Sequence, residues 1–265
     1  MYKIIDYVDA ISMNYTKAAQ KANILFRILY RIETARLIKY EQYVLKTFDK
    51  HIIISSVDRD FILAHAKGLT SHTIDVIGNS TSFDDEIIQQ NDSRNIVFVG
   101  SMFYEPNIVA VTTFAHHIMP LILEKEPLTH FYIVGSRPTS SVRKLTSRHI
   151  TVTGFVESPK EYLRKAAVVV VPMYTGAGVQ NKILEAMSIG CCVVTTEIGA
   201  EGLTNIKNGR EIVIKTEYAA MAEQIIALLR NREQRQEIGV HAKEYIQNNL
   251  TFNRILEQFE QIFLD

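Results

Sequence analysis

A lysine and a glutamate one helical turn apart, placed just after two glycines, form the strongest chemical signal in the chain. The segment VVVVPMYTGAGVQNKILEAMSIG places Gly176 and Gly178 ahead of Lys182 and Glu185. Glycines let a backbone approach a ligand closely, and a helix amino end attracts phosphate through free N–H groups and its dipole. Lys182 would neutralise phosphate, while Glu185, on nearly the same helix face, would accept hydrogen bonds from ribose hydroxyls. This pattern predicts a nucleotide site.

Each of these residues also has a simpler interpretation. The glycines could serve only a tight turn, Lys182 could pair with Glu185, and Glu185 could be a solvated helix carboxylate. The sequence neighbours of Glu185 are apolar, however, and a carboxylate in apolar surroundings needs a partner. We therefore favour the ligand-binding interpretation.

The elements that must position this site are expected in the order strand, glycine loop, helix, strand, glycine loop. The apolar run 168–171 predicts a strand buried on both faces of a parallel sheet. A helix is expected over Asn181–Ile189, a second strand over Cys191–Thr195, and a tight turn over Gly199–Gly202. Both loops then follow carboxyl ends of strands, where open parallel sheets bind ligands.

Regular alternation of strands and helices from Asn95 onward predicts a doubly wound parallel sheet. The expected further strands are 96–100, 131–135, 150–154 and 211–214, and the expected helices are 106–124, 139–148, 159–165, 217–230, 232–248 and 252–264. Candidate ligand contacts at the strand ends are Gly100, Ser101, Arg137, Gly154, Phe155 and Val156. Tyr104 and Asn107 could line the cleft or start a helix, Arg137 could be loop surface, and Phe155 could be core.

Residues 1–90 are expected to form a separate, partial α/β domain, with the boundary in the polar linker 78–94 and a second domain over 91–265. Residues 14–49 carry no proline or glycine and have helical periodicity, so they predict one helix or a helix pair. Its basic residues favour a solvated face. The alternative is a surface that meets an anionic membrane, where lipid-linked acceptors reside.

Composition bounds the remaining possibilities. The chain has 265 residues, 47% of them hydrophobic and 22% charged, with a formal net charge of zero. This is typical of a folded, soluble protein, and it gives no global attraction to nucleic acid. The adjacent Cys191 and Cys192 suggest core side chains in a reducing compartment. No secretory signal or membrane-spanning run is recognised, so a cytoplasmic location is expected. The histidines show no metal-binding pattern.

The pattern GxGxxNKxLEAMxxGxxVVTTxxGxEGL resembles the donor-binding segment of retaining, GT-B-fold glycosyltransferases of family four, particularly the bacterial polysaccharide sugar transferases. The resemblance implies a nucleotide diphosphate sugar as donor, a saccharide or lipid-linked acceptor, retained anomeric configuration, and no required metal or other cofactor. It assigns Lys182 and Glu185 as catalytic. It assigns donor contacts to Gly176, Ala177, Gly178, Val179, Gln180 and Asn181 in the first loop, and to Gly199, Ala200 and Glu201 in the second.

The chain departs from the family in two respects. Many members carry two glutamates seven residues apart; Glu185 fits the second, but Ala177 occupies the place of the first. Only the second half of the family's amino-terminal domain is recognisable, in VDAISMNY and SSVDRD. A companion chain could supply the rest. Two other functions therefore stay open: a non-catalytic nucleotide-binding subunit, and a nucleotide-sugar epimerase of the same fold. In GT-B relatives the last helix crosses back to the amino-terminal domain, and Phe252, Ile255, Leu256, Phe259 and Phe263 are expected to pack there.

Overall fold

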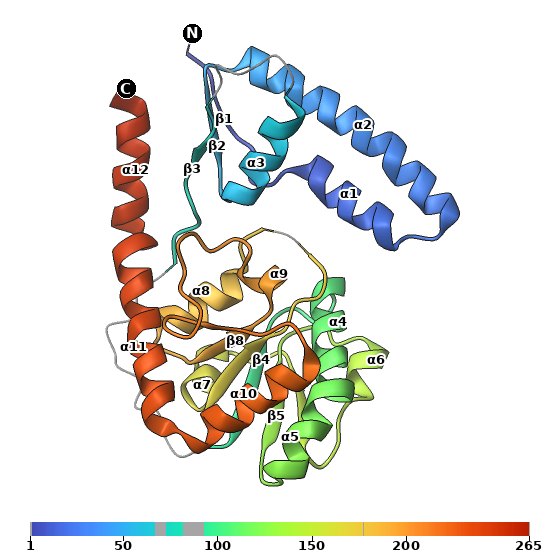
Figure 1. Cartoon of the computed structure of the whole chain (residues 1–265), viewed down its shortest axis with the longest axis vertical. Coiled ribbons are helices and arrows are strands. Elements are labelled where there is room, and N and C mark those ends of the chain that lie inside the picture. The colour runs from blue at the N-terminus through green and yellow to red at the C-terminus, as the bar shows by residue number, and fades with distance from the viewer. Residues whose placement is uncertain (1, 67–72, 82–92, 177, 265) are drawn as a thin grey trace.

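Two parallel β-sheets organise the chain (Figure 1). The computed structural model describes residues 2–66, 73–81, 93–176 and 178–264. The smaller sheet has the strand order β1-β2-β3. Its strands are β1 (Ile4–Asp6), β2 (Lys50–Ile53) and β3 (Asp75–Val76), and its helices are α1 (Ile11–Lys21), α2 (Ile24–Thr47) and α3 (Ser56–His65). We call this part the amino-terminal unit.

The predicted helical stretch of the amino-terminal unit is a helix pair. α1 and α2 form an antiparallel hairpin that projects from the small sheet (Figure 1). The break falls at Ala22, and the side chain of Asn23 then caps α2 by accepting from the backbone N–H of Phe26. Asparagine at this position satisfies one of the free donors at a helix start.

The larger sheet has six strands, and every described pairing within it is parallel. We call this part the carboxy-terminal unit. Its strands are β4 (Asn95–Val99), β5 (His130–Val134), β6 (Ile150–Gly154), β7 (Val168–Val171), β8 (Val193–Thr195) and β9 (Val213–Ile214). Its helices are α4 (Glu105–Thr113), α5 (Met119–Lys125), α6 (Ser140–Arg143), α7 (Pro159–Arg164), α8 (Asn181–Ser188), α9 (Glu197–Ala200), α10 (Tyr218–Arg230), α11 (Arg232–Asn249) and α12 (Phe252–Leu264).

The strand order β6-β5-β4-β7-β8-β9 makes this sheet doubly wound, as predicted. The chain moves outward from β4 to β6 and then returns to the other side of β4 as β7, so the winding reverses between β4 and β7. All four valines of β7 are buried, as a central strand covered on both faces requires. The carboxyl ends of the central strands face the amino-terminal unit (Figure 1).

Several local predictions need correction. The expected helix 139–148 is only the single turn α6, because Ser147 and Ile150 pair in a tight reversal. The expected turn at 199–202 instead begins within the short helix α9. The expected strand 191–195 starts at Val193, although both cysteines are buried. The domain boundary predicted near residue 90 lies outside the described residues.

One helical stretch contradicts the expectation that no segment is apolar enough to cross a bilayer. Glu105–Lys125, in which a π-helical segment (η1, Phe114–Ile118) joins α4 to α5, meets that criterion by length and composition. Phe114, Ile118 and Ile122 are fully buried in the core of the carboxy-terminal unit. These contacts explain its apolar composition as that of a core helix.

The last helix, α12, crosses back to the small sheet, as the family resemblance implied (Figure 1). Ile255 is buried against Ile52 and Ile77, with Phe259 packed beside them. Phe252 and Leu256 were also expected to pack there, but both are exposed. The side chain of Phe263 lies outside the description.

Candidate functional site

The loop that leaves β7 has the backbone geometry that its glycines predicted. Gly176 and Gly178 adopt φ angles of +106° and +73°, which residues with a Cβ rarely adopt. α8 then begins at Asn181, and the side chain of Gln180 at its N-cap makes no capping hydrogen bond. No side chain at the N-cap therefore competes with an anion for the first N–H groups of α8. Ala177 lies outside the described residues.

Lys182 lies in the first turn of α8, where it is partly buried. Its Nζ donates a 2.8 Å hydrogen bond to Oε1 of the buried Gln180, so its partner is Gln180 and not Glu185. Burial lowers the pKa of Lys182 to about 8, while the nearby Glu185 carboxylate opposes the shift. A cation held in such a desolvated place is stabilised by a bound anion.

Glu185 is exposed, so the argument that it lies in apolar surroundings is wrong. Its sequence neighbours Ile183, Leu184, Ala186 and Met187 are buried. Because successive helix residues point about 100° apart, apolar neighbours in sequence lie on the opposite side of α8. The assignment of Glu185 to ribose hydroxyls thus rests on the resemblance and on its place one turn beyond Lys182.

The ends of β4 and β5 lie against each other. A Cβ on Gly135 would come within 1.7 Å of the carbonyl oxygen of Gly100, so only glycine fits there. Asn107 is buried, and its Nδ2 donates to the carbonyl of Ser101 at 3.0 Å. Asn107 thus supports the loop from beneath, whereas Tyr104 lines the cleft described below. The side chain of Ser101 is exposed.

The loops after β5 and β6 present exposed side chains. Arg137 is exposed with a φ of +54°, an uncommon conformation for a residue other than glycine. Phe155 is 77% exposed, so the alternative that it is core is wrong. It follows Gly154, whose φ is +72°, and precedes Val156, which packs on the core. An exposed aromatic ring at a strand end is suited to stacking on a planar ligand.

Gly199 and Ala200 have structural roles within α9. The N–H of Gly199 donates to Oγ1 of Thr196, and the N–H of Ala200 donates to the carbonyl of Thr196. A Cβ on Gly199 would lie 2.1 Å from Oγ1 of Thr195. Their amides are therefore already engaged. Glu201 forms a bidentate ion pair with Lys17 of α1, with both distances 2.9 Å.

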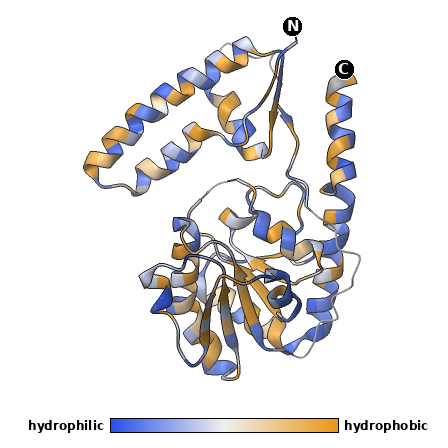
Figure 2. Cartoon of the chain, turned by 180° about the vertical axis from the view of Figure 1, so that it is seen from behind, coloured by the Kyte–Doolittle hydropathy of each residue, from blue (hydrophilic) through white to orange (hydrophobic). Residues whose placement is uncertain are grey.

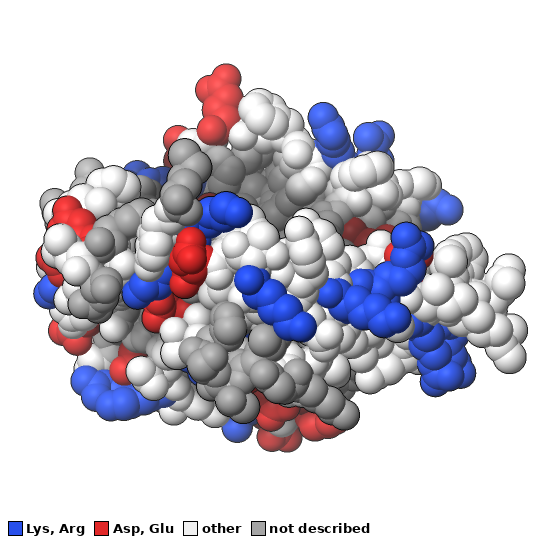
Figure 3. All heavy atoms as spheres, turned by 90° about the horizontal axis from the view of Figure 1, so that it is seen from above, with Lys and Arg blue, Asp and Glu red and all other residues white. Residues whose placement is uncertain are grey.

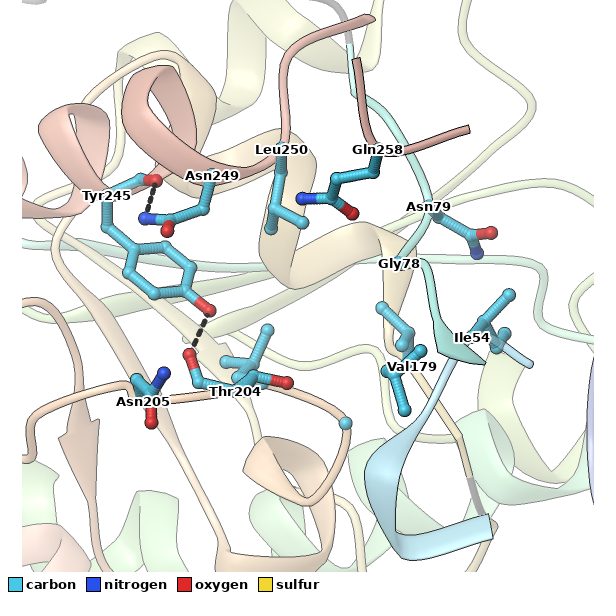
Figure 4. Close-up of a pocket in the computed structure, with 13 residues that line it drawn as sticks. Ile54, Gly78, Asn79, Val179, Thr204, Asn205, Tyr245, Asn249, Leu250 and Gln258 are labelled. Carbon is cyan, nitrogen blue, oxygen red and sulfur yellow. Dashed lines mark hydrogen bonds between the residues drawn. The ribbon is translucent and has the colours of Figure 1, made fainter. Parts of the chain in front are cut away.

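Val179 and Asn181 lie beside a second cavity between the units. Val179 lines this cavity of about 230 Å³ together with Gly78 and Leu250 (Figure 4). Asn181 accepts a hydrogen bond from Asn79, which also lines that cavity. These contacts tie the β7 loop and α8 to the connection between the units.

A cleft of about 800 Å³ opens between the two units in front of the β7 loop. The carboxy-terminal unit contributes Tyr104, Glu105, Pro106, Val109, Thr175, Gly176, Ile198 and Glu201, and the amino-terminal unit contributes Asp9, Asn14, Lys17, Ala18 and Gln20. Of the predicted contacts, Gly176 and Glu201 line this cleft. Arg137, Phe155 and Lys182 are not among its lining residues. Arg137 follows β5, Phe155 follows β6, and Lys182 lies in α8.

Asp9 is a candidate that the sequence reasoning missed. A Cβ on Gly178 would lie 2.8 Å from Oδ1 of Asp9, so the carboxylate approaches the glycine loop closely. Burial raises the pKa of Asp9, and the nearby Asp58 raises it further. Its only sequence signal was its place after the predicted first strand, within VDAISMNY.

Two buried carboxylates hold Asp9 in position. Asp58 Oδ1 accepts from the N–H of Ala10 at 2.9 Å. Glu41 accepts from both the N–H and the hydroxyl of Ser12. These bonds fix the start of α1, so Asp58 of SSVDRD and Glu41 of α2 support the segment VDAISMNY. Among the residues that the structure describes, no group of three or more His, Cys, Asp or Glu could hold a metal ion.

Solved structures with the same architecture define the fold class. TarM from S. aureus matches with a TM-score of 0.72 and 18% identity over 87% of this chain and 47% of its own; it was solved with fondaparinux, alpha-GlcNAc-glycerol and UDP. Sucrose-phosphate synthase from Thermosynechococcus elongatus matches with a TM-score of 0.73 and 16% identity over 98% of this chain and 66% of its own. HepE from Anabaena, solved with UDP and glucose, matches with a TM-score of 0.71 and 12% identity; the match covers 99% of this chain and 71% of HepE. The fold is that of the GT-B glycosyltransferases.

The family follows from the sequence itself. Residues 93–231, slightly more than half of the chain, match the family described as glycosyl transferases group 1. The chain belongs to this family. A curated relative, an uncharacterized 44.6 kDa protein in the cps region of Klebsiella pneumoniae, is 25% identical over 251 residues. That alignment covers 91% of this chain and 62% of the relative.

Proposed function

We propose that this chain binds a nucleotide diphosphate sugar and transfers its sugar, with retention, to a saccharide or lipid-linked acceptor in polysaccharide synthesis, as a member of family four. The observation that carries the proposal is the amino end of α8, which has no side-chain cap and holds a desolvated lysine beside a left-handed glycine loop. Relatives support it: TarM and HepE were solved with UDP, and the Klebsiella protein comes from the cps region.

The geometry suggests how the chain would assist departure of the diphosphate. As the bond from the sugar carbon to the diphosphate oxygen breaks, negative charge grows on that oxygen. The first N–H groups of α8, the glycine-loop amides and the Lys182 ammonium would stabilise this charge. Phe155 would stack on the base, and Glu185 would accept hydrogen bonds from the ribose. By analogy with the family, the leaving phosphate takes the proton of the attacking acceptor hydroxyl on the same sugar face.

The cleft between the units would hold the sugar and its acceptor. Asp9 and Glu201 line it from opposite units, and their carboxylates can accept hydrogen bonds from sugar hydroxyls. Ala177 stands where many family members place a glutamate near the donor sugar. We propose that Asp9, which approaches the adjacent Gly178, supplies a carboxylate on that side instead.

A ligand screen tests the binding step. Nucleoside diphosphates and their sugar conjugates are titrated while the melting temperature of the chain is followed, because a ligand of the folded state raises it. At least one should stabilise the wild type, and Lys182→Ala should abolish most of the shift. Lys160→Ala, which changes an exposed lysine of α7, serves as the control. Equal shifts in all three proteins would exclude Lys182 from the site.

Release of nucleoside diphosphate in the presence of saccharide acceptors tests the transfer step. The anomeric proton of the product, observed by NMR, reports retention or inversion. Binding without transfer would favour the alternative of a non-catalytic nucleotide-binding subunit. A free 2-epimer of the donor sugar would identify an epimerase instead.

A further inference from the structure

The tip of the α1–α2 hairpin exposes an unusual amount of apolar surface. Six large apolar side chains at the start of α2 are between 48% and 78% exposed: Ile24, Leu25, Phe26, Ile28, Leu29 and Ile32. The ribbon coloured by hydropathy shows hydrophobic residues at the end of the hairpin (Figure 2). We call these six residues the hairpin tip. Contiguous exposed apolar surface of this kind marks a site of interaction with a protein or a membrane.

The arrangement of the hairpin tip suits a bilayer surface. Because successive residues are rotated by about 100°, residues 24, 25, 26, 28, 29 and 32 cover roughly 200° of the circumference of α2, and Arg27 and Arg31 lie on the remainder. A broad apolar face with basic residues on the opposite side, at the projecting end of a hairpin, suits a helix that lies among lipid headgroups and acyl chains.

The charges nearest the hairpin tip are mainly basic. Residues 10–32 contain Lys17, Lys21, Arg27 and Arg31 and no aspartate or glutamate, in a chain whose net charge is zero. Lys17 pairs with Glu201, and Glu33, which follows Ile32, pairs with Arg36, so Arg27 and Arg31 supply the basic charge beside the tip. Viewed from above, basic side chains lie beside a protruding end of the molecule that is drawn white, the colour of residues other than Lys, Arg, Asp and Glu (Figure 3). Basic residues next to a bilayer gain attraction from anionic lipids, so the tip combines both requirements for peripheral binding.

A groove between α1 and α2 places two of these cations together. It has a volume of about 400 Å³ and is lined by Arg27 and Arg31 with Thr16, Ala19, Gln20 and Thr34. Guanidinium groups paired in this way suit the phosphate of a lipid headgroup. Gln20 also lines the cleft between the units. The groove and the cleft therefore adjoin each other at Gln20 of α1.

We propose that the hairpin tip inserts into an anionic bilayer, with Arg27 and Arg31 holding lipid phosphates in the groove between α1 and α2. The surface does not depend on the nucleotide site, so this inference goes beyond the proposed function and can fail or succeed separately. It assigns membrane attachment to the amino-terminal unit and leaves the cleft facing the lipid surface from which an acceptor would arrive.

Co-sedimentation of the full chain with lipid vesicles tests the proposal. The probes are phosphatidylcholine vesicles and vesicles in which about a third of the lipid is phosphatidylglycerol. The wild type should partition into the anionic vesicles and much less into the neutral ones, and high salt should weaken binding. Arg27→Gln with Arg31→Gln should lower partitioning about 30-fold, because each basic residue near an anionic surface contributes about fivefold. Leu25→Ser with Leu29→Ser should lower it at least about tenfold.

Matched controls separate these effects from general changes of surface. Leu128→Ser removes an 80% exposed leucine from the carboxy-terminal unit, and Lys144→Gln with Arg148→Gln removes two exposed cations there. Both should partition as the wild type does, and circular dichroism should show that every variant is folded. Equal binding to neutral and anionic vesicles would overturn the proposal, as would unchanged binding of the hairpin variants. A dimer that Leu25→Ser with Leu29→Ser disperses, without vesicle binding by the wild type, would show that a second copy covers the tip.

Discussion

The lowered pKa of Lys182 makes the binding of a diphosphate depend on pH. It lies in the first turn of α8 and donates to Gln180, and burial lowers its pKa to about 8. A nearby diphosphate would favour its charged form and raise its pKa again. Binding above pH 8 must therefore take up a proton, whereas binding below pH 7 does so only slightly.

The affinity for a nucleoside diphosphate should fall as pH rises through the pKa of Lys182. With a pKa of about 8, the protonated fraction falls roughly tenfold between pH 7 and pH 9, so the dissociation constant should rise by about the same factor. Calorimetric titration at the two pH values measures it. Lys182→Arg keeps its charge throughout this range and should lose the pH dependence; an Arg variant with the wild-type profile would place the titrating group elsewhere.

Replacing Asp9 with asparagine should raise the stability of the chain and lower its activity. Burial and Asp58 raise its pKa, so its ionised form costs stability at neutral pH, and this cost is absent below the unfolded pKa. Asp9→Asn should therefore raise the melting temperature while lowering turnover about 100-fold or more, if the carboxylate acts on the reacting sugars. Nucleoside diphosphate binding should change little. Asp60→Asn, on the exposed face of α3, is the control. A variant of Asp9 that is fully active would remove it from the site.

At the residue scale, the sequence correctly predicted those site residues whose position is set by the local backbone conformation. Gly176, Gly178 and Lys182 could be recognised because a strand, a glycine loop and a helix start are all local features. The apolar surroundings expected for Glu185 were wrong, and so was the alternative that placed Phe155 in the core, since exposure depends on which face packs against distant elements. Asp9 could not be found from one sequence, because its approach to Gly178 joins segments far apart in the chain.

At the element scale, α11 is fixed to the end of α8 by a contact between two backbones. A Cβ on Gly239 of α11 would lie 2.1 Å from the carbonyl oxygen of Gly190, which follows α8. α8 carries the lysine and glutamate of the site, so this contact positions them from behind. No flexible side chain is available to absorb added volume there.

Gly239→Ala should therefore destabilise the chain even though alanine favours helices. Overpacking of this kind costs about 1–3 kcal/mol of the free energy of unfolding, which chemical denaturation can measure. Val240→Ala, at a half-exposed neighbouring position, should change it by less than about 0.5 kcal/mol. An unchanged or higher stability of Gly239→Ala would mean that α11 does not pack this closely in solution.

Elements with strong hydrophobic periodicity were predicted well, whereas the short helices between them were not. The strands at 150–154 and 168–171 and the last helix at 252–264 have the expected bounds. α6 is shorter than its pattern, and α9 replaced a predicted turn. Both depend on local hydrogen bonds between residues three apart, which hydrophobic periodicity does not report, namely the Ser147–Ile150 pairing and the cap that Thr196 provides.

At the scale of the whole molecule, an ion pair joins the two units across the rim of the cleft. Lys17 of α1 and Glu201 beside α9 approach to 2.9 Å, with side chains 38% and 22% exposed. The connection at the back runs through Thr81, whose N–H donates to the carbonyl of Leu250 between α11 and α12. The units are thus held at both sides of the loop after β7.

A double-mutant cycle of Lys17→Met and Glu201→Gln should measure a modest coupling. Because the pair is partly solvated, we expect about 0.5–1 kcal/mol in the free energy of unfolding, decreasing in high salt. A coupling of zero at low salt would mean that the units do not hold this ion pair in solution.

The central claim is that a nucleotide lies along the carboxyl ends of β6 and β7 with its diphosphate at the amino end of α8. Photolabelling tests it most directly, with an azido-base derivative of the nucleoside diphosphate that stabilises the chain most. Peptide mapping should place the label around Gly154–Val156, and the unmodified diphosphate should compete it away. A specific label confined to the amino-terminal unit, or one that Lys182→Ala leaves unchanged in yield, would contradict the account.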